Sequence, residues 1–165
     1  MNEYSNIQLK IRQLEDQLSQ STDAFEQVDC MNELAGELFV YEIGKAQNYC
    51  REARKLAELI NYEKGIADSC NKEALCCRIR SDFKKSILLS REALAIFESL
   101  EDKSGQADSL NNISFMEVNV EDYESALKNS LRALALAKKA GEKDLEAFSS
   151  LVIGMVYEAL GDYPV

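Results

Sequence analysis

Apolar and small residues recur at three- and four-residue spacings along the chain, which is the spacing of one face of an α-helix. One such stripe consists of Phe83, Ile87, Ser90, Leu94 and Phe97, and another of Tyr123, Leu127, Ser130, Leu134 and Ala137. The second stripe repeats the first at a constant offset of forty residues. The pattern therefore predicts two equivalent amphipathic helices.

The forty-residue offset extends well beyond these two stripes. The residues that recur unchanged forty positions later are Gly65, Ala67, Asp68, Ser69, Asn71, Asp82, Ser90, Ala93, Leu94, Ala95 and Lys103. A repeat of this size is typical of stacked helical hairpins, because each hairpin can bury its apolar face only against its neighbours. We therefore expect function on a surface of the stack rather than in a catalytic pocket.

The repeat predicts four hairpins, at about 24–61, 64–100, 104–140 and, incompletely, 144–165. Their helices are expected at about 24–40, 44–60, 64–80, 83–99, 104–120, 123–140 and from 144 onward. Aspartates at 82, 122 and 162 precede second helices and are expected to be N-caps. Asp23 and Glu26 form a capping-box pattern at the start of the first hairpin.

The last hairpin lacks its second helix. By the period this helix begins at Tyr163, and Pro164 fits its first turn. The sequence stops at Val165. We expect either that the chain is a piece of a longer protein or that another chain covers the exposed face.

Residues 1–22 lie outside the repeat and predict one further helix. Its apolar residues Ile7, Ile11, Leu14 and Leu18 form a single stripe. We expect this helix to cap the first hairpin. The alternative is a coiled-coil seam for a homodimer, although fewer than three heptads are present.

Composition supports an all-α protein, since only seven of the 165 residues are glycine and one is proline. The formal net charge is -10, so a nucleic-acid backbone is repelled and nucleic-acid binding is disfavoured. The acidity serves either solubility or a preference for basic peptides. No stretch approaches the ~20 apolar residues of a membrane helix, and the N-terminus is unlike a signal peptide. We expect a cytoplasmic location.

Candidate chemistry is scarce. Four of the five cysteines fall on small or apolar core positions of the repeat, whereas Cys77 shares its position with Glu117 and Tyr157 and is expected to be partly exposed. With an odd cysteine count and no histidine, the sequence favours neither a disulfide framework nor a zinc site. It shows no Gly-rich loop before a helix and no nucleophile beside a plausible base. We therefore expect no enzyme, no metal and no cofactor in this segment.

The segment 151–163 carries Leu-Val-Ile-Gly-Met-Val-Tyr followed by Gly-Asp-Tyr. It resembles a tetratricopeptide repeat, and Ala126, Leu127 and Ala133 match the small residues of that family's second helix. The resemblance covers about 23–165. Glu73 and Glu117 depart from the family's preferred Leu and Tyr, the helix-ending proline is missing, and the first hairpin is one residue shorter.

The resemblance implies a right-handed superhelical stack of antiparallel hairpins whose first helices form a concave wall. The forty-residue period resembles arrays in bacterial signalling proteins and kinesin light chains, which implies a sensor or docking module. By spacing, the residues expected on the concave wall to bind a protein or peptide are Asp68, Asn71, Lys72, Leu75, Arg78, Asp108, Asn111, Asn112, Phe115, Asn119, Phe148, Met155 and Glu158.

Asn71 and Asn111 are stacked by the period, and a carboxamide can pair with both the C=O and the N–H of a peptide backbone. The alternative is that these amides bond to neighbouring helices or water. Phe115, Phe148 and Met155 are candidates for apolar pockets, with core packing as their alternative role. The competing function for the whole segment is a homo-oligomerisation scaffold that uses the N-terminal helix and the uncovered last helix.

Overall fold

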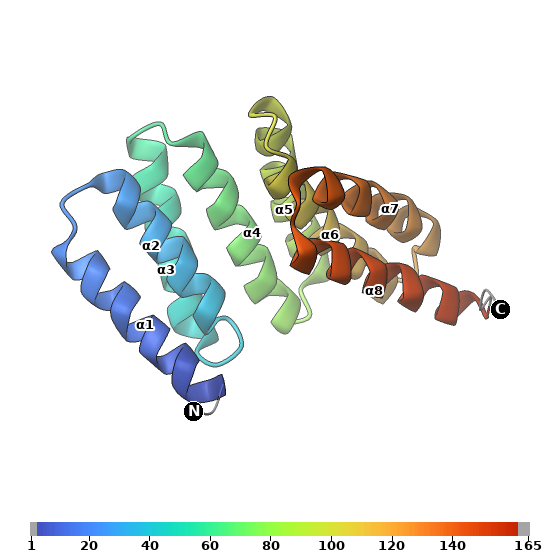
Figure 1. Ribbon diagram of the computed structural model, residues 1–165, viewed down its shortest axis with the longest axis horizontal. Coiled ribbons are helices and arrows are strands. Elements are labelled where there is room, and N and C mark those ends of the chain that lie inside the picture. Colours follow the sequence, from blue (N-terminus) through green and yellow to red (C-terminus); the bar gives the residue numbers. More distant parts are fainter. Residues whose placement is uncertain (1–2, 162–165) are drawn as a thin grey trace.

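The structure of the chain is a computed structural model that describes residues 3–161, with side chains from Ser5 onward. Within these residues it contains eight α-helices and no strand (Figure 1). The helices are α1 (Glu3–Gln20), α2 (Ala24–Leu38), α3 (Ile43–Leu59), α4 (Glu63–Ile79), α5 (Phe83–Ser99), α6 (Lys103–Asn119), α7 (Tyr123–Ala140) and α8 (Lys143–Leu160). All lie within two residues of the expected bounds.

Some expectations concern residues outside the described range. The N-cap at Asp162 and the helix from Tyr163, with Pro164 in its first turn, fall there.

The turns explain the length of the repeat. Left-handed backbone conformations recur at twenty-residue intervals, at Asn61, Ser81, Glu101, Glu121, Gly141 and Gly161. Each follows the C-terminal end of a helix, and the first five turn the chain toward the next helix. Because α4, α5 and α6 each have 17 residues, a helix and its three-residue turn occupy twenty residues, and two such units make one repeat.

Aspartates cap the second helices α5 and α7 as the sequence predicts, whereas the N-cap residue of α3 is Glu42, whose side chain makes no capping bond. The Asp82 side chain accepts a hydrogen bond from the main-chain N of Lys85 at 3.2 Å, and Asp122 accepts one from Ser125 N at 3.2 Å. Asp102 caps α6 in the same way. Each cap contributes about 1 kcal/mol by satisfying a donor that the helix itself leaves unpaired.

The capping box expected at the start of α2 is only half formed. Asp23 accepts hydrogen bonds from Phe25 N at 2.8 Å and Glu26 N at 3.2 Å. The Glu26 carboxylate does not return to the main chain of Asp23, because Ser21 Oγ accepts from Asp23 N at 3.2 Å and donates to Glu26. Glu26 also accepts from Gln17 Nε2 at 2.8 Å, which joins α2 to α1.

Successive hairpins stack along the chain, with α1 at one end and α8 at the other (Figure 1). The first helices of the hairpins contact one another, since α2 packs on α4, α4 on α6 and α6 on α8. Within residues 3–161, the second helices α3, α5 and α7 do not pack on one another in this way, and the ion pairs Arg54–Glu92 and Arg132–Glu98 bridge the gaps between them. The first helices therefore line the narrower, concave side, which we call the inner wall, and the second helices form the outer wall.

The stripe of α1 packs on the first hairpin. Ile11 and Leu14 are buried in a cluster that includes Leu34 and Leu38 of α2. Ile7 and Leu18 contact the same cluster. The stripe is thus covered by the chain's own α2, and it is not free to form a coiled-coil seam with another copy.

All five cysteines are buried and free. This confirms the expected place of four of them in the core, whereas the expectation that Cys77 is partly exposed is wrong. Burial raises the pKa of Cys70 to about 12, so this thiol stays protonated at neutral pH. Arg54 Nη1 lies 3.3 Å from its sulfur and does not abolish that effect.

Candidate functional site

A repeated hydrogen bond joins the first helices to one another. In each case a serine hydroxyl donates to the side-chain oxygen of an asparagine on the preceding first helix. The pairs are Ser69 with Asn32, Ser109 with Asn71, and Ser149 with Asn111, at 2.9, 3.2 and 2.7 Å. We call these pairs the Asn–Ser latches, and all their members are buried.

Asn71 and Asn111, the two asparagines that the repeat directs toward a ligand, are both members of the latches. Asn71 and Asn111 are each 1% exposed. Asn71 Nδ2 also donates to the Asp108 carboxylate at 3.1 Å, and Asn111 Nδ2 donates to the main-chain oxygen of Leu145 at 3.1 Å. The expectation that these amides pair with a bound peptide is therefore wrong, because neighbouring helices already satisfy them.

A cavity of about 260 Å³ opens on the inner wall between α4, α6 and α8, and we call it the inner-wall cavity. The side chains that line it are Phe39, Leu75, Arg78, Asp108, Asn111, Asn112, Asp144, Leu145 and Phe148. Most of these residues were expected on the concave wall. The cavity combines apolar walls with a few polar groups, which is the usual composition of a binding site.

Arg78 is the cation of this cavity. Its guanidinium carbon lies 5.1 Å from the ring centre of Phe115 and 5.8 Å from that of Phe39. Burial lowers the pKa of Arg78, and the nearby Asp108 charge opposes that effect. In the described part of the chain no carboxylate lies within ion-pair distance of Arg78. The aromatic rings orient the guanidinium while its N–H donors stay available.

Asn112 is the unsatisfied polar group of the cavity. Its side chain is 5% exposed, and its Nδ2 has no hydrogen-bond partner among the described residues. An amide donor buried without an acceptor costs about 1–3 kcal/mol. An acceptor oxygen brought by a ligand would remove this cost.

Other expected residues lie around the cavity. The rings of Phe115 and Phe148 are 5.8 Å apart, so α6 and α8 meet through aromatic side chains behind Arg78. Asp68 and Lys72 line the adjoining hollow of the inner wall, where Lys64 Nζ lies 3.5 Å from Asp68. These residues form one continuous site with the cavity, because the hollow shares Asp108 with it.

Three expected residues do not join this site. Asn119 is exposed at the end of α6, where its Nδ2 donates to the main-chain oxygen of Phe115 at 2.6 Å. Met155 and Glu158 lie in α8 and line neither the cavity nor the adjoining hollow. All three lie in the C-terminal halves of their helices, whereas the residues of α8 that line the cavity come from its N-terminal half.

Sequence reasoning missed Phe39, Asp144 and Leu145. Phe39 stands thirty-nine residues before Arg78, which is the same repeat position once the shorter first hairpin is allowed for. This thirty-nine-residue offset is the sequence feature that indicates Phe39 as a neighbour of the site. Asp144 and Leu145 come from the first turn of α8, and no feature of the sequence alone indicates that this turn leans over α6.

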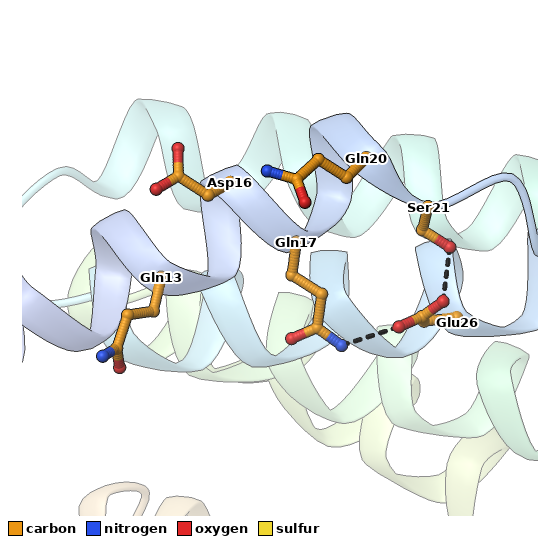
Figure 2. A pocket seen from close by; sticks show the side chains of 6 residues that line it. All are labelled: Gln13, Asp16, Gln17, Gln20, Ser21 and Glu26. Atoms are coloured by element: carbon orange, nitrogen blue, oxygen red, sulfur yellow. Dashed lines mark hydrogen bonds between the residues drawn. The ribbon is translucent and has the colours of Figure 1, made fainter.

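A second opening lies at the turn between α1 and α2 (Figure 2). It is lined only by polar side chains, including Gln13, Asp16 and Gln20. Gln17 and Ser21 donate to Glu26 across it, and this bonding lowers the pKa of Glu26. The hydrogen bonds of the turn account for this arrangement, and no aromatic or apolar side chain lines the opening.

Other classes of site receive no support. None of the helices in residues 3–161 has the length and apolar composition needed to cross a membrane. The same residues contain no group of three or more side chains placed to hold a metal ion.

The similarity of this chain to known proteins lies in its structure. No profile of a known protein family matches the sequence, and no curated protein matches it. The crystal structure of BtubC (BKLC) from P. vanneervenii is similar, with a TM-score of 0.70 and 23% identity over 87% of this chain and 60% of that one.

A second similar structure is that of a signal transduction ATPase with numerous domains (STAND) from Pyrococcus horikoshii, which has a tetratricopeptide repeat sensor. Its TM-score is 0.69, and the identity is 19% over 86% of this chain and 22% of that one. The chain has the tetratricopeptide-repeat fold. It spans 60% and 22% of the lengths of these two proteins, and at such identities the likeness concerns the fold.

Proposed function

We propose that the inner wall binds a peptide or a helix of a partner protein, and that the chain is the regulatory or sensor part of a larger bacterial signalling protein. The observation that carries this proposal is the inner-wall cavity, where Asn112 lacks an acceptor and Arg78 lacks a carboxylate. The sensor role draws on the tetratricopeptide repeat sensor of the STAND protein. We further propose that the segment is non-catalytic, cytoplasmic and does not bind nucleic acid.

A peptide suits the groups that the cavity offers. Phe148 and Leu75 provide apolar surface for one side chain of the partner. Asn112 Nδ2 is a donor for a main-chain carbonyl, which every peptide carries. The Arg78 donors suit a second acceptor. Recognition of this kind places the binding energy in a few anchoring contacts.

The test uses a random peptide library displayed on phage and selected on the immobilised chain. Affinities of selected peptides are then measured by fluorescence anisotropy. We expect Phe148→Ala and Asn112→Ala each to weaken binding about tenfold, which corresponds to about 1.4 kcal/mol. Asn119→Ala is the matched control, because Asn119 is exposed on the same helix but outside the cavity. The proposal would be contradicted if the selected peptides bound the Phe148→Ala and Asn112→Ala variants as tightly as the unmodified chain.

A second candidate function is homo-oligomerisation through α8. In α4, Ala67 and Ala74 are buried against α5. The equivalent residues of α8, Ala147 and Gly154, are exposed, and so is Leu151 between them, at 56%. An exposed face with small residues at this spacing suits a second helix, which another copy of the chain can supply.

Sedimentation equilibrium over a range of concentrations separates the two candidates. Oligomerisation predicts a dimer that Leu151→Lys converts to a monomer. A monomer at every concentration excludes this candidate and leaves the peptide-binding proposal unaffected.

A further inference from the structure

The negative charge of the chain is concentrated on one wall. The three outer-wall helices together contain eleven Lys or Arg and five Asp or Glu, a net charge of +6. The four inner-wall helices contain five and twelve, a net charge of -7. Acidity that served only solubility would be spread over both walls, so this separation calls for another explanation.

The acidic side chains also face the open spaces of the inner wall. The adjoining hollow shares Lys64, Asp68 and Lys72 with a further hollow on α2 and α4. The cavity and these two hollows are lined by three cations, Lys64, Lys72 and Arg78, and by seven carboxylates: Asp29, Glu33, Asp68, Asp102, Asp108, Glu142 and Asp144. Among the described residues, Asp68 is the one of these carboxylates that forms an ion pair, with Lys64. The negative potential of the wall is thus largely uncompensated.

Helix capping accounts for some of these carboxylates but not for Asp68 and Asp108. Asp102 is an N-cap, and Asp144 lies in the first turn of α8, where the helix dipole favours a carboxylate. Asp68 and Asp108 lie in the second turn of α4 and α6, beyond that effect. Burial raises the pKa of Asp68, and Asp108 acts in the same direction although Lys64 and Lys72 oppose it. A stack of like charges is therefore maintained at a cost.

The aromatic side of the cavity gives an independent indication of a ligand. Asn112 Nδ2 is buried without an acceptor and lines the same cavity as Asp108 and Asp144. One bound segment can therefore supply both an acceptor oxygen to Asn112 and a cation to the two carboxylates. Leu75 and Phe148 complete the site with apolar surface.

We propose that the partner segment is basic as well as apolar: it places a Lys or Arg side chain at Asp108 and Asp144, an apolar side chain against Leu75 and Phe148, and a main-chain carbonyl at Asn112. This inference rests on the proposed function and adds the chemical class of the partner. Arg78 also lines the cavity, between Phe39 and Phe115, and among the described residues it forms no ion pair with Asp108 or Asp144.

The test uses three short synthetic peptides with the same central Leu-Phe pair, flanked by Lys, Gln or Glu. At low salt we expect the Lys peptide to bind about tenfold more tightly than the Gln peptide and the Glu peptide to bind least. High salt should narrow these differences, because it screens exposed charges. Binding is measured by fluorescence anisotropy on the full 165-residue chain.

The decisive variant is Asp108→Asn with Asp144→Asn. It removes the two charges and keeps an acceptor for Asn71. We expect it to abolish the preference for Lys over Gln. The matched control is Glu52→Gln with Glu124→Gln, which changes the net charge equally on the exposed outer wall and should leave the preference intact. Thermal unfolding followed by circular dichroism verifies that both variants fold.

The outcomes separate this inference from the proposed function. If Phe148→Ala weakens all three peptides but charge does not matter, or the Glu peptide binds best, the inference is wrong and the groove function stands. If Phe148→Ala changes none of the affinities, or no peptide binds, both are wrong. Self-association at low salt that the Asp108 and Asp144 double variant abolishes would assign the site to the basic outer wall of a second copy, and would also overturn the inference.

Discussion

At the scale of single residues, adjacent asparagines of α6 have opposite roles. Asn111 is held in a latch by Ser149 and by the main chain of Leu145. Asn112, one residue later, lines the inner-wall cavity, and its Nδ2 has no hydrogen-bond partner among the described residues. A helix turns by about 100° per residue, so one side chain meets the neighbouring first helix and the next meets the groove. Only the second is available to a partner.

The latches predict a stability effect rather than a binding effect for Asn111. Asn111→Ala removes both hydrogen bonds and leaves the buried hydroxyl of Ser149 with one partner fewer, so we expect a loss of about 2 kcal/mol. Urea unfolding followed by circular dichroism measures this loss. Asn119→Ala, at an exposed position of the same helix, should stay within about 0.5 kcal/mol of the unmodified chain. Equal stability of the two variants would show that the latch contributes nothing.

The buried Glu117 carboxyl group should make the stability of the fold depend on pH. Its side chain is 3% exposed and accepts from Asn129 Nδ2 at 2.8 Å, and burial raises its pKa above the usual 4.5. A raised carboxyl pKa means that the folded state holds this proton more tightly than the unfolded state. The charge therefore destabilises the fold above the folded pKa, and this destabilisation disappears as the pH falls below the usual value.

Glu117→Gln keeps an acceptor for Asn129 and removes the charge. We expect it to stabilise the chain by about 1 kcal/mol at pH 7, with a gain that shrinks as the pH falls toward the usual pKa of a glutamate. Thermal unfolding at a series of pH values measures the gain. A constant gain across the series, or a loss at neutral pH through the Arg91 contact at 3.8 Å, would contradict this account.

At the scale of elements, the turns are the least favourable local structures. Glu101 and Glu121 hold positive φ angles of 55° and 63°, which cost a non-glycine residue energy that glycine does not pay. Gly141 holds the equivalent position after α7 at a φ of 79°. The same turn thus recurs with a strained backbone at the two glutamates and an unstrained one at the glycine.

Exchanging residues at these turns should change stability in opposite directions. We expect Glu121→Gly to stabilise by about 0.5–1 kcal/mol and Gly141→Ala to destabilise by about 1 kcal/mol. A Cβ on Gly141 meets no atom within 4 Å, so its loss reflects backbone conformation alone. Urea midpoints of the two variants test the pair. A change of the same sign in both would exclude backbone strain as the cause.

At the scale of the whole molecule, stability depends on contacts between neighbouring units. Each hairpin buries its faces against the preceding and following ones, and α1 takes the place of a preceding hairpin for α2. We expect removal of residues 1–22 to lower the free energy of unfolding by roughly 3 kcal/mol or more, because burial of Ile11 and Leu14 is lost. Ile11→Ala should have a smaller effect of the same sign, and Leu9→Ala, at a half-exposed position, almost none. Unchanged thermal unfolding of the shortened chain would exclude a capping role for α1.

Much of the fold follows from local interactions that can be predicted from the sequence. Asp82 and Asp122 begin helices because their side chains satisfy free donors, and the stripes of α5 and α7 require a neighbour to bury them. The site follows less directly. Helix spacing places Arg78, Asp108, Asn112 and Phe148 on the wall where the cavity opens. The same spacing directs Asn71 toward a ligand, although Asn71 bonds to a serine on the next first helix. Spacing gives the direction of a side chain but not what stands opposite it.

The sequence by itself determined the period, the helices, the turns that separate them and the residues of the core, since these depend on interactions within about twenty residues. The tertiary structure decided how closely the first helices approach one another. That approach buries Asn71 and Asn111, brings Phe39 to Arg78 and the first turn of α8 to the cavity, and gathers carboxylates around the cavity and its hollows. It depends on how side chains of separate hairpins fit together, and a repeat of forty residues does not specify this fit.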